Sequence, residues 1–395
     1  TSKLLKDAGI LEKNVDNYLL FKKNIELLKN KYTHYLDIHS NIKFGNDYRV
    51  ANNIWDTIHN PITIDMITTG KNIPTVNEQE EKYYNRDILQ DRSKSLTLPM
   101  QNFHNKIIKN KILLSNVVKQ IRLSGVNKIS LLDLACGKGG DIAKWRDNKI
   151  SKCVGIDNVS NNILDSNDGA CQRLEFYKKN SNKNLPEIYF LIGDVAKNIK
   201  NDDAFTDSRF KNLFRNLWLP HSTYDTNFGT NKFDIISIMF AIHYFFDTKE
   251  NLDMLVTNID ENLKKGGYLI GTCFDGDKIF KLLEDIPFKQ EKSGFKGGNK
   301  IWKIIKDYNE VEFPKNDLSI GMKIRVLISS IGKIIPEWLV NFDYLSQKLA
   351  EKGIKKLSSD EIEKMNLPSS ESIGSFKEVF DTLKNVKKEE NIYPI

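Results

Sequence analysis

The sequence predicts an α/β fold, a doubly wound and Rossmann-like parallel sheet with helices on both faces, together with an N-terminal arm and an insertion. Three observations predict it. Short apolar runs alternate with helical stretches from residue 129 onward, and a glycine-rich turn at 136–140 directly follows the first of those runs. The chain has 395 residues, of which 40% are hydrophobic and 28% charged, so it can bury a core.

The elements follow in chain order from the apolar pattern. Continuous apolar runs predict strands, and apolar residues at helical spacing predict the helices between them. The expected strands cover 129–135, 152–156, 188–192, 233–240 and 268–273, and the expected helices run through Trp145, near 160–180 and near 249–264. Further strands are expected at 300–305 and 322–329, followed by a helix over 337–349.

Two segments depart from this alternation. Residues 197–231 carry charge, Pro220, Gly229 and scattered aromatics, and they are too long for an ordinary connection, so we interpret them as an insertion. The end of the chain is rich in Lys and Glu, which predicts a flexible tail at about 350–395. Both segments belong to a predicted domain of residues 91–395.

Residues 1–90 are interpreted as an N-terminal arm or linker. Leu and Ile recur at helical spacing up to about residue 40, and turn formers break the pattern around Pro61, Gly70 and Pro74. The first residue is Thr1, and no signal-peptide apolar core follows it. We therefore expect the chain to be cut from a longer polypeptide.

Composition excludes several classes of protein. No apolar stretch approaches the roughly 18 residues of a membrane span. The four cysteines, Cys136, Cys153, Cys171 and Cys273, are too widely spaced for a zinc site and too few for a disulfide scaffold, so we expect a reducing compartment and no metal. The net charge of +7 permits a nucleic-acid partner without requiring one.

The sharpest charge feature is a stretch without acidic residues between Asp91 and Asp133. Its apolar residues recur at helical spacing, so we expect an amphipathic helix with a basic outer face. Asn105 and Lys109 lie about one turn apart in this segment and share one face of that helix. On charge alone, an RNA-binding face and an ordinary solvated face are equally good interpretations.

The glycine-rich turn has the features of a nucleotide loop, since glycines between a strand and a helix let the backbone approach a ligand. A dinucleotide fingerprint would require glycine where Ile142 stands, and no Gly-Lys-Ser/Thr phosphate loop is present. The next two strands end in Asp157 and Asp194, which suit ribose hydroxyls and an adenine edge. The pattern therefore predicts an S-adenosylmethionine loop.

With this loop in place, the run 132–141, followed by Lys144 and Trp145, resembles the hallmark of mRNA cap guanine-N7 methyltransferases. The similarity covers about residues 99–345. The stretch Ala51–Gly70 looks like the branch found in multifunctional capping enzymes of large cytoplasmic DNA viruses, as does the Ser-Ile-Gly run that begins at residue 330.

The resemblance implies a class I S-adenosylmethionine-dependent methyltransferase that transfers a methyl group to guanine N7 of the GpppN cap. It implies S-adenosylmethionine as cofactor, S-adenosylhomocysteine as product and no metal. The implied partners are the capped 5′ end of mRNA and a preceding guanylyltransferase domain in the same polypeptide, with a small stimulatory subunit left open and no membrane. The implied location is cytoplasmic, in a viral factory or virion if the source is viral, in preference to the nucleus.

Carried over by position, the resemblance assigns two sets of residues. The cofactor set is Lys109, Ala135, Gly137, Asp157, Asp194, Met239 and Tyr244. The cap set is Asn105, Lys138, Lys144, Arg173, Phe240, His243, Trp302 and Glu337. Family members usually have Gly where Ala135 stands and commonly Gln where Met239 stands, so a backbone contact is expected at the first position and no side-chain hydrogen bond at the second.

The chemistry of these side chains suits the implied roles. Cations such as Lys138, Lys144 and Arg173 neutralise a triphosphate bridge. An ionised Glu337 accepts hydrogen bonds from guanine N1–H and the exocyclic amine together, and adenine has no matching donor pair. No residue is expected to act covalently, and Glu337, His243 and Tyr244 are expected to position the substrate.

Plainer interpretations stay open for several of these residues. Glu337 also suits the start of a helix, His243 a satisfied core histidine and Arg173 a solvated helix face. A methyltransferase for another RNA base, or a noncatalytic or stimulatory methyltransferase-like subunit of an RNA-processing complex, is the alternative function. Tyr393 is a weak candidate for the aromatic that family members often carry in a final strand near the cap.

Overall fold

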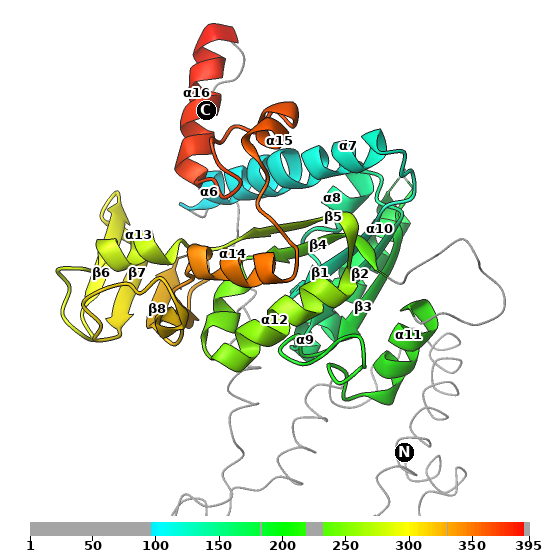
Figure 1. The fold of residues 1–395 in the computed structure, drawn as a ribbon, viewed down its shortest axis with the longest axis horizontal. Helices are drawn as coiled ribbons and strands as arrows, with labels where there is room; N and C mark the ends of the chain where they lie inside the picture. Colours follow the sequence, from blue (N-terminus) through cyan, green and yellow to red (C-terminus); the bar gives the residue numbers. More distant parts are fainter. Residues whose placement is uncertain (1–95, 182–183, 219–231, 330, 391–395) are drawn as a thin grey trace, which may run out of the picture. The chain divides into compact units, whose positions relative to one another are not determined.

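The computed structural model describes residues 96–390 apart from 182–183, 219–231 and 330 (Figure 1). The predictions made for residues 1–90, for Pro220 and Gly229, and for Tyr393 lie outside the described residues.

A parallel five-stranded sheet forms the centre of the described fold, with the strand order β3-β2-β1-β4-β5. Its strands are β1 (Ser130–Leu134), β2 (Lys152–Asp157), β3 (Glu187–Ile192), β4 (Phe233–Met239) and β5 (Leu263–Thr272). All five overlap the runs expected as strands. The order reverses between β1 and β4, and ligands of open α/β sheets bind at such a switch point, at the carboxyl ends of the strands.

Helices cover both faces of this sheet (Figure 1). The described α-helices are, in chain order, α6 (Leu98–Asn102), α7 (Asn116–Leu123), α8 (Ile142–Asp147), α9 (Ser160–Leu164), α10 (Ala170–Asn180), α11 (Ser208–Trp218), α12 (Lys249–Asn262), α13 (Gly276–Leu282), α14 (Phe342–Glu351), α15 (Ser359–Lys364) and α16 (Phe376–Glu390). Leu131 of β1 packs in a core with Val117 and Trp145, on the α7 and α8 face. Its neighbour Leu132 packs in the opposite core with Leu252 of α12, as the alternation of a strand requires. The doubly wound α/β class is thereby confirmed.

Residues 98–123, in the stretch without acidic residues, form one continuous helical segment. α6 leads into a π-helical stretch, Phe103–Ser115, and then into α7. Its buried side is apolar and includes Ile108, Leu114 and Ile121, so the predicted amphipathic helix is confirmed. None of the helices in the described ranges combines the length and the apolar character needed to cross a membrane.

A second, antiparallel sheet follows the first and has the order β6-β7-β8-β9. Its strands are β6 (Glu291–Lys296), β7 (Asn299–Asp307), β8 (Lys323–Ile328) and β9 (Ile334–Trp338). The strand β9 corrects one expectation, because Glu337 was placed at the start of a helix over 337–349. The helix α14 instead begins at Phe342, where the Asn341 side chain caps it by accepting a hydrogen bond from Tyr344 N (3.0 Å).

The expected insertion at 197–231 stays a prediction, and the expectation of a flexible tail is corrected. The described part of the expected insertion packs against the main core, with the buried rings of Phe205 and Phe214 only 5.1 Å apart. The described part of the expected tail folds into α15 and α16, and Ile362, Met365 and Val379 are buried there. Apolar residues spaced among the lysines and glutamates supply these contacts, and composition alone hides that spacing.

Candidate active site

The loop after β1 approaches the cleft through its backbone. Ala135, Gly137 and Gly139 all have left-handed backbone, with φ of 56°, 54° and 65°. Nothing lies within 4 Å of the point where a Cβ on Gly137 would stand, so the loop faces open space there. Ala135 holds this conformation with a side chain, at a cost of roughly 1 kcal/mol, where the family usually has Gly.

Asp157, at the end of β2, ties this loop to the sheet. Its carboxylate accepts hydrogen bonds from Gly137 N (2.8 Å), from Val159 N (3.0 Å) and from Asn162 Nδ2 (3.0 Å). Burial raises the pKa of Asp157, and these three donors oppose that shift. Oδ2 accepts only one of the three bonds in the described structure, which leaves capacity for a further donor on the side that lines the cleft.

Asp194 follows β3 and is held by its own turn. Its backbone N donates to Ala204 O (2.8 Å), and its Oδ1 accepts from Ala196 N (3.0 Å). The preceding Gly193 has no room for a side chain, because an added Cβ would lie 2.7 Å from the Phe205 ring. Close packing at Gly193 therefore sets the position of Asp194 at the rim of the cleft.

Two lysines on different elements share the carboxylate of Asp141. Lys109 Nζ lies 3.1 Å from Oδ2, and Lys144 Nζ lies 2.5 Å from Oδ1. Burial alone would raise the pKa of Asp141, but the two lysines outweigh it and the pKa is lowered. Lys109 also lies 5.7 Å from the centre of the Phe240 ring, which adds a cation–π contact.

The other two predicted cap cations converge on Asp168 in the same way. Lys138 Nζ lies 2.5 Å from Oδ1, and Arg173 Nη2 lies 3.8 Å from Oδ2. Arg173 Nε also donates to the backbone oxygen of Asp168 (2.9 Å). All four cations expected to bind ligand are therefore paired with carboxylates of the chain.

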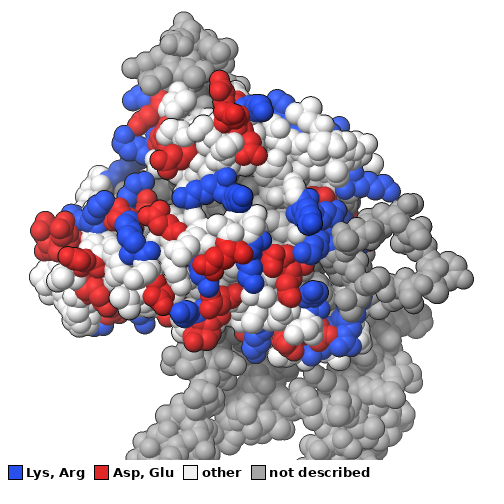
Figure 2. All heavy atoms as spheres, viewed as in Figure 1, with Lys and Arg blue, Asp and Glu red and all other residues white. Residues whose placement is uncertain are grey.

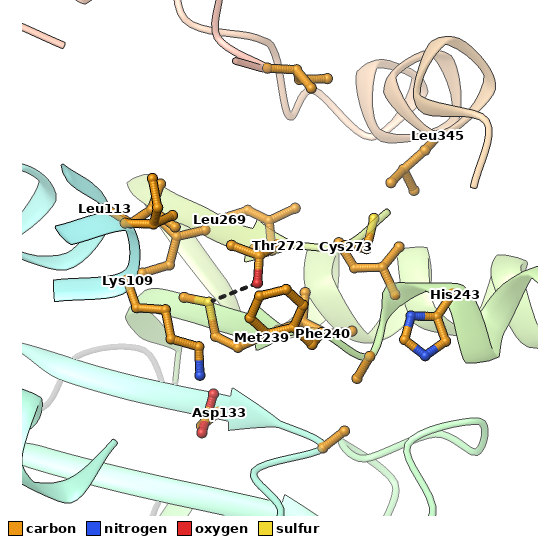
Figure 3. Close-up of a pocket in the computed structure, with 18 of the residues that line it drawn as sticks. Lys109, Leu113, Asp133, Met239, Phe240, His243, Leu269, Thr272, Cys273 and Leu345 are labelled. Carbon is orange, nitrogen blue, oxygen red and sulfur yellow. Dashed lines mark hydrogen bonds between the residues drawn. The ribbon is translucent and has the colours of Figure 1, made fainter. Parts of the chain in front are cut away.

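The end of β4 carries the next group of predicted residues (Figure 3). Thr272 Oγ1 donates to the sulfur of Met239 (3.7 Å), a weak acceptor, so this side chain offers the cofactor no amide hydrogen bond. Phe240 has left-handed backbone with φ of 58°, the second residue with a side chain in that conformation at this edge of the sheet. A short 3₁₀ helix, Ile242–Phe246, then brings the rings of His243 and Tyr244 to a centroid separation of 4.1 Å.

Glu337 on β9 and His243 on the 3₁₀ helix Ile242–Phe246 face each other in the cleft. His243 Nε2 lies 3.9 Å from Glu337 Oε2, too far for a hydrogen bond. Both side chains are buried, and neither ring nitrogen nor Glu337 Oε2 has a hydrogen-bond partner among the described residues. Burial raises the pKa of Glu337 to about 8 and lowers the pKa of His243 to about 3. The pair consists of buried polar atoms that the fold itself leaves unsatisfied.

The sequence did not predict three further features of the site, which are the roles of Asp141 and Asp168 and the ring contacts of His104. Asp141 and Asp168 were visible in the sequence but were not recognised as counter-ions of the cations. The ring of His104 lies 5.4 Å from Phe240 and 4.7 Å from Phe376, which starts α16. No local signal marks Phe376, because the contact joins elements far apart in the chain.

One cleft of about 3060 Å³ brings nearly all the predicted residues together. It exceeds the range of roughly 300 to 1,000 Å³ of single small-ligand sites, so it has room for a cofactor and a substrate. Its lining includes Asn105, Lys109, Ala135, Gly137, Lys138, Lys144, Asp157, Arg173, Asp194, Met239, Phe240, His243, Tyr244 and Glu337.

Trp302 is the exception among the predicted cap residues, because it does not line this cleft. It stands on β7 opposite Gly294 of β6 and packs against the core of the second sheet. A Cβ added at Gly294 would lie 2.1 Å from the indole Nε1, so the ring occupies the space that this glycine leaves. The expectation that Trp302 contacts the cap therefore finds no support in the geometry.

The loop side of the cleft fits S-adenosylmethionine. The open backbone at Gly137, the spare lone pair of Asp157 and the rim carboxylate of Asp194 follow one another along the strand ends β1, β2 and β3. Within the described ranges, no three His, Cys, Asp or Glu side chains gather where they could hold a metal ion.

Comparison with known proteins decides the family. A family model for the mRNA (guanine-N(7))-methyltransferase domain matches residues 69–391. The chain belongs to this family. It is 30% identical to a "Probable mRNA-capping enzyme" of Acanthamoeba polyphaga mimivirus over 89% of this chain and 28% of that protein. It is also 26% identical to an mRNA cap guanine-N(7) methyltransferase of Saccharomyces cerevisiae over 74% of this chain and 59% of that protein.

These matches confirm the resemblance drawn from the run 132–141, and the chain spans less than two thirds of either relative. Among solved structures, an S-adenosylmethionine-dependent methyltransferase from Clostridium acetobutylicum is 12% identical with a TM-score of 0.37, covering 66% of this chain and 88% of that one. The aminopentose methyltransferase CalS10 from Micromonospora echinaspora is 10% identical with a TM-score of 0.35, covering 67% and 91%. The fold class rests on the strand order described above.

Proposed function

We propose that this chain transfers a methyl group from S-adenosylmethionine to guanine N7 of the GpppN cap of mRNA. The observation that carries the proposal is the buried pair Glu337 and His243, because Glu337 Oε2 and both ring nitrogens of His243 have no hydrogen-bond partner within the described part of the chain. Such atoms are costly to bury, so they are expected where a ligand completes their hydrogen bonds. Membership in the guanine-N7 methyltransferase domain family supports the same conclusion.

Glu337 supplies the recognition of guanine. Its ionised carboxylate accepts hydrogen bonds from guanine N1–H and the exocyclic amine, the two donors that burial otherwise denies it. Those donors favour the ionised form, so guanine binding lowers the pKa of Glu337 from its raised value of about 8. Adenine offers no such donor pair, and it would leave the carboxylate unpaired in a buried site.

His243 serves as a neutral partner beside this carboxylate. Because burial lowers the pKa of His243 to about 3, the ring is uncharged at neutral pH and carries one donor and one acceptor. A neutral ring N–H donates to the guanine O6 carbonyl without placing a competing cation beside Glu337. Tyr244 packs on this ring, with the centroids 4.1 Å apart, and limits its rotation.

The cations at the mouth of the loop serve the triphosphate bridge. Lys138 and Arg173 reach the cleft from the β1 loop and from α10, and Lys144 reaches it from α8. On the face of the molecule drawn in Figure 2, basic and acidic side chains are interspersed. We therefore assign the phosphate contacts to the lysines and the arginine that line the cleft, in preference to the face drawn there.

The proposed reaction depends on the positioning of the methyl donor and of guanine N7. S-adenosylmethionine, when bound, supplies a methyl group already activated by the sulfonium. Guanine N7 carries a free lone pair at neutral pH, so no residue of the chain has to remove a proton. Orientation of two such reactants supplies on the order of 7 to 11 kcal/mol. Glu337, His243 and Tyr244 fix the base, while Asp157 fixes the loop at the carboxyl ends of the strands.

The test is transfer of a labelled methyl group by the purified chain to GpppG-capped RNA, with ApppG-capped RNA, GTP and uncapped RNA as a panel. Methylation confined to guanine-capped substrates supports the proposal. Equal methylation of uncapped RNA would favour a methyltransferase for another base. Absence of transfer together with absence of S-adenosylhomocysteine binding would favour a noncatalytic subunit.

We also propose that this domain works within a larger capping enzyme. The match of 89% of this chain to 28% of the mimivirus protein supports a polypeptide with further capping activities, including the guanylyltransferase expected from the sequence. A small stimulatory subunit and location in a cytoplasmic viral factory belong to the same proposal. Co-purification from the native source and cell fractionation test these two points.

A further inference from the structure

The carboxylate of Asp168 lies between two cations of the cleft. Its two oxygens are divided between Lys138 Nζ, 2.5 Å from Oδ1, and Arg173 Nη2, 3.8 Å from Oδ2. A phosphate group presents the same arrangement of anionic oxygens to lysine and arginine. Asp168, Lys138 and Arg173 all line the cleft, so the carboxylate lies on the surface that a substrate contacts.

The turn that carries Asp168 is fixed by its own hydrogen bonds. Backbone N of Asp168 donates to Asp165 Oδ1 (3.3 Å), and Gly169 N donates to Asp165 O (3.0 Å). The turn closes so tightly that a Cβ on Gly169 would lie 2.6 Å from the Asp165 backbone. Arg173 Nε donates to the backbone oxygen of Asp168 (2.9 Å), an anchor that needs no contribution from the carboxylate.

A second carboxylate in the cleft shows what distinguishes Asp168. Asp141 also binds two cations, but its side chain is only 13% exposed and both of its lysine contacts are 3.1 Å or shorter. The side chain of Asp168 is 26% exposed, and its contact with the arginine side chain is long. The contact of Asp168 with Lys138 is as short as that of Asp141 with Lys144, 2.5 Å in both pairs, so the difference lies in the exposure and in the arginine contact. Partial exposure lets the released carboxylate be solvated, so a ligand opens the Asp168 pairs at a lower cost than the Asp141 pairs.

We propose that Asp168 is a resident anion that holds Lys138 and Arg173 in the absence of substrate and yields them to the polyphosphate bridge of the cap. The inference rests on the proposed function and deepens it, because it makes Asp168 a specificity-determining residue. A ligand with one phosphate group replaces the carboxylate of Asp168 with a single anionic group, so it gains little from the exchange. A bridge of three phosphate groups brings more charge than it displaces, so binding favours long polyphosphates.

The test compares Asp168→Asn with the unchanged chain in calorimetric titrations with GpppG, with guanosine monophosphate and with inorganic tripolyphosphate. The asparagine keeps the shape of the side chain and removes its charge. We expect GpppG and tripolyphosphate to bind about threefold to tenfold more tightly to the variant, the scale of one partly screened charge. The ratio of the affinity for tripolyphosphate to the affinity for guanosine monophosphate is expected to decrease, because the variant lacks the carboxylate that competes with ligands of one phosphate group.

A matched control removes one carboxylate charge outside the cleft. Asp277→Asn breaks an exposed pair with Lys281 on α13, outside the cleft lining, so it changes net charge equally without freeing a cleft cation. We expect its affinity for tripolyphosphate to be unchanged. In a Lys138→Gln background, Asp168→Asn is expected to lose most of its effect, because one of the two released cations is absent.

The outcomes separate the inference from the proposed function. Unchanged or weaker polyphosphate binding in Asp168→Asn, with unchanged thermal stability and S-adenosylhomocysteine affinity, overturns the resident-anion role and indicates that the carboxylate merely orients the cations. If stability falls, Asp168→Ser repeats the test with a smaller neutral side chain. Tighter tripolyphosphate binding without any GpppG binding would uphold Asp168 and overturn the cap proposal.

Discussion

The buried carboxylates of the cleft differ between the half around Asp157, proposed to hold the cofactor and called the cofactor half, and the half around Glu337 and His243, proposed to hold guanine and called the guanine half. In the cofactor half, Asp157 accepts three hydrogen bonds from the chain before any ligand is present. In the guanine half, Glu337 Oε2 and both ring nitrogens of His243 have no partner among the described residues. Folding satisfies the carboxylate of the first half, whereas under the proposed function the substrate supplies the missing hydrogen bonds of the second.

This difference indicates which carboxylate determines the substrate selectivity of the site. A satisfied carboxylate stabilises the fold and positions the loop, so its loss is expected to harm stability and binding together. An unsatisfied carboxylate destabilises the fold and is retained for function, so its loss is expected to separate the two effects. Substitutions that remove one charge from each half can test this distinction.

The largest expected effect is on methyl transfer in Glu337→Gln. The amide keeps the size of the side chain, but its NH₂ faces one of the two guanine donors. We expect kcat/KM for GpppG-capped RNA to fall by about 100-fold or more, on the scale of losing hydrogen bonds to a buried charge. S-adenosylhomocysteine affinity, measured by calorimetry, is expected to stay within about twofold. A variant with normal turnover would remove Glu337 from guanine recognition.

The matched change in the other half is Asp157→Asn. Its new NH₂ group meets Gly137 N–H, a donor that the carboxylate now satisfies at 2.8 Å. We expect the free energy of unfolding to fall by about 2 kcal/mol and cofactor affinity to fall with it. Chemical denaturation and calorimetry measure the two quantities. If stability stays the same while binding is lost, Asp157 acts on the ligand alone and the contrast between the halves is weaker than described.

The next expected effect is on the pH dependence of stability, and it tests the guanine half. Burial raises the pKa of Glu337 from its ordinary 4.5 to about 8. The contribution of Glu337 to the free energy of unfolding is therefore fully present below pH 4.5 and is lost as the pH rises through 8. His243 has the opposite shift, from 6.5 to about 3, so its contribution changes only below about 6.5. Burial also raises the pKa of Asp133 to about 7, but Asp133 is present in both the unchanged chain and Glu337→Gln.

Between pH 6.5 and 8.5 we therefore expect Glu337→Gln to gain stability relative to the unchanged chain, reaching about 1 to 2 kcal/mol. Thermal unfolding in parallel buffers measures the difference curve. GpppG, by supplying donors to the carboxylate, is expected to reduce that difference. A flat difference curve would mean that Glu337 finds a partner in the free chain.

The smallest expected effect concerns backbone strain in the cofactor half. Ala135 has φ of 56°, which glycine adopts without strain. Ala135→Gly is expected to change the free energy of unfolding by no more than about 1 kcal/mol, since relief of strain offsets the greater freedom of the unfolded chain. S-adenosylhomocysteine affinity is expected to be retained. A large loss of affinity would show that the methyl group itself contacts the ligand.

Sequence predicted the cofactor half better because its parts are local. The run 132–141 and the ends of β2 and β3 follow a repeating strand-and-turn pattern, and the parallel order of the strands brings them together. Glu337 was located by resemblance, but its position on a strand was not predicted, because Pro336 and Glu337 also suit the start of a helix.

The remaining features depend on contacts that no local pattern encodes. Phe376 reaches His104 from the opposite end of the described chain, and the packing of α15 and α16 requires a surface that other elements build. Trp302 was assigned by position in a family pattern, yet the glycine opposite it on β6 gives its ring a place away from the cleft. The pairing of cations with Asp141 and Asp168 likewise appears only once separate elements converge.

The central claim is that Glu337 reads the donor edge of the cap guanine, and one measurement tests it most directly. Inosine lacks only the exocyclic amine of guanine, so kcat/KM is compared for GpppG- and IpppG-capped RNA in the unchanged chain and in Glu337→Gln. We expect the unchanged chain to prefer guanine by about 30-fold, the scale of one hydrogen bond to a charged acceptor, and the variant to lose most of that preference. Equal rates on both caps in the unchanged chain, or a preference that survives in Glu337→Gln, would contradict the account.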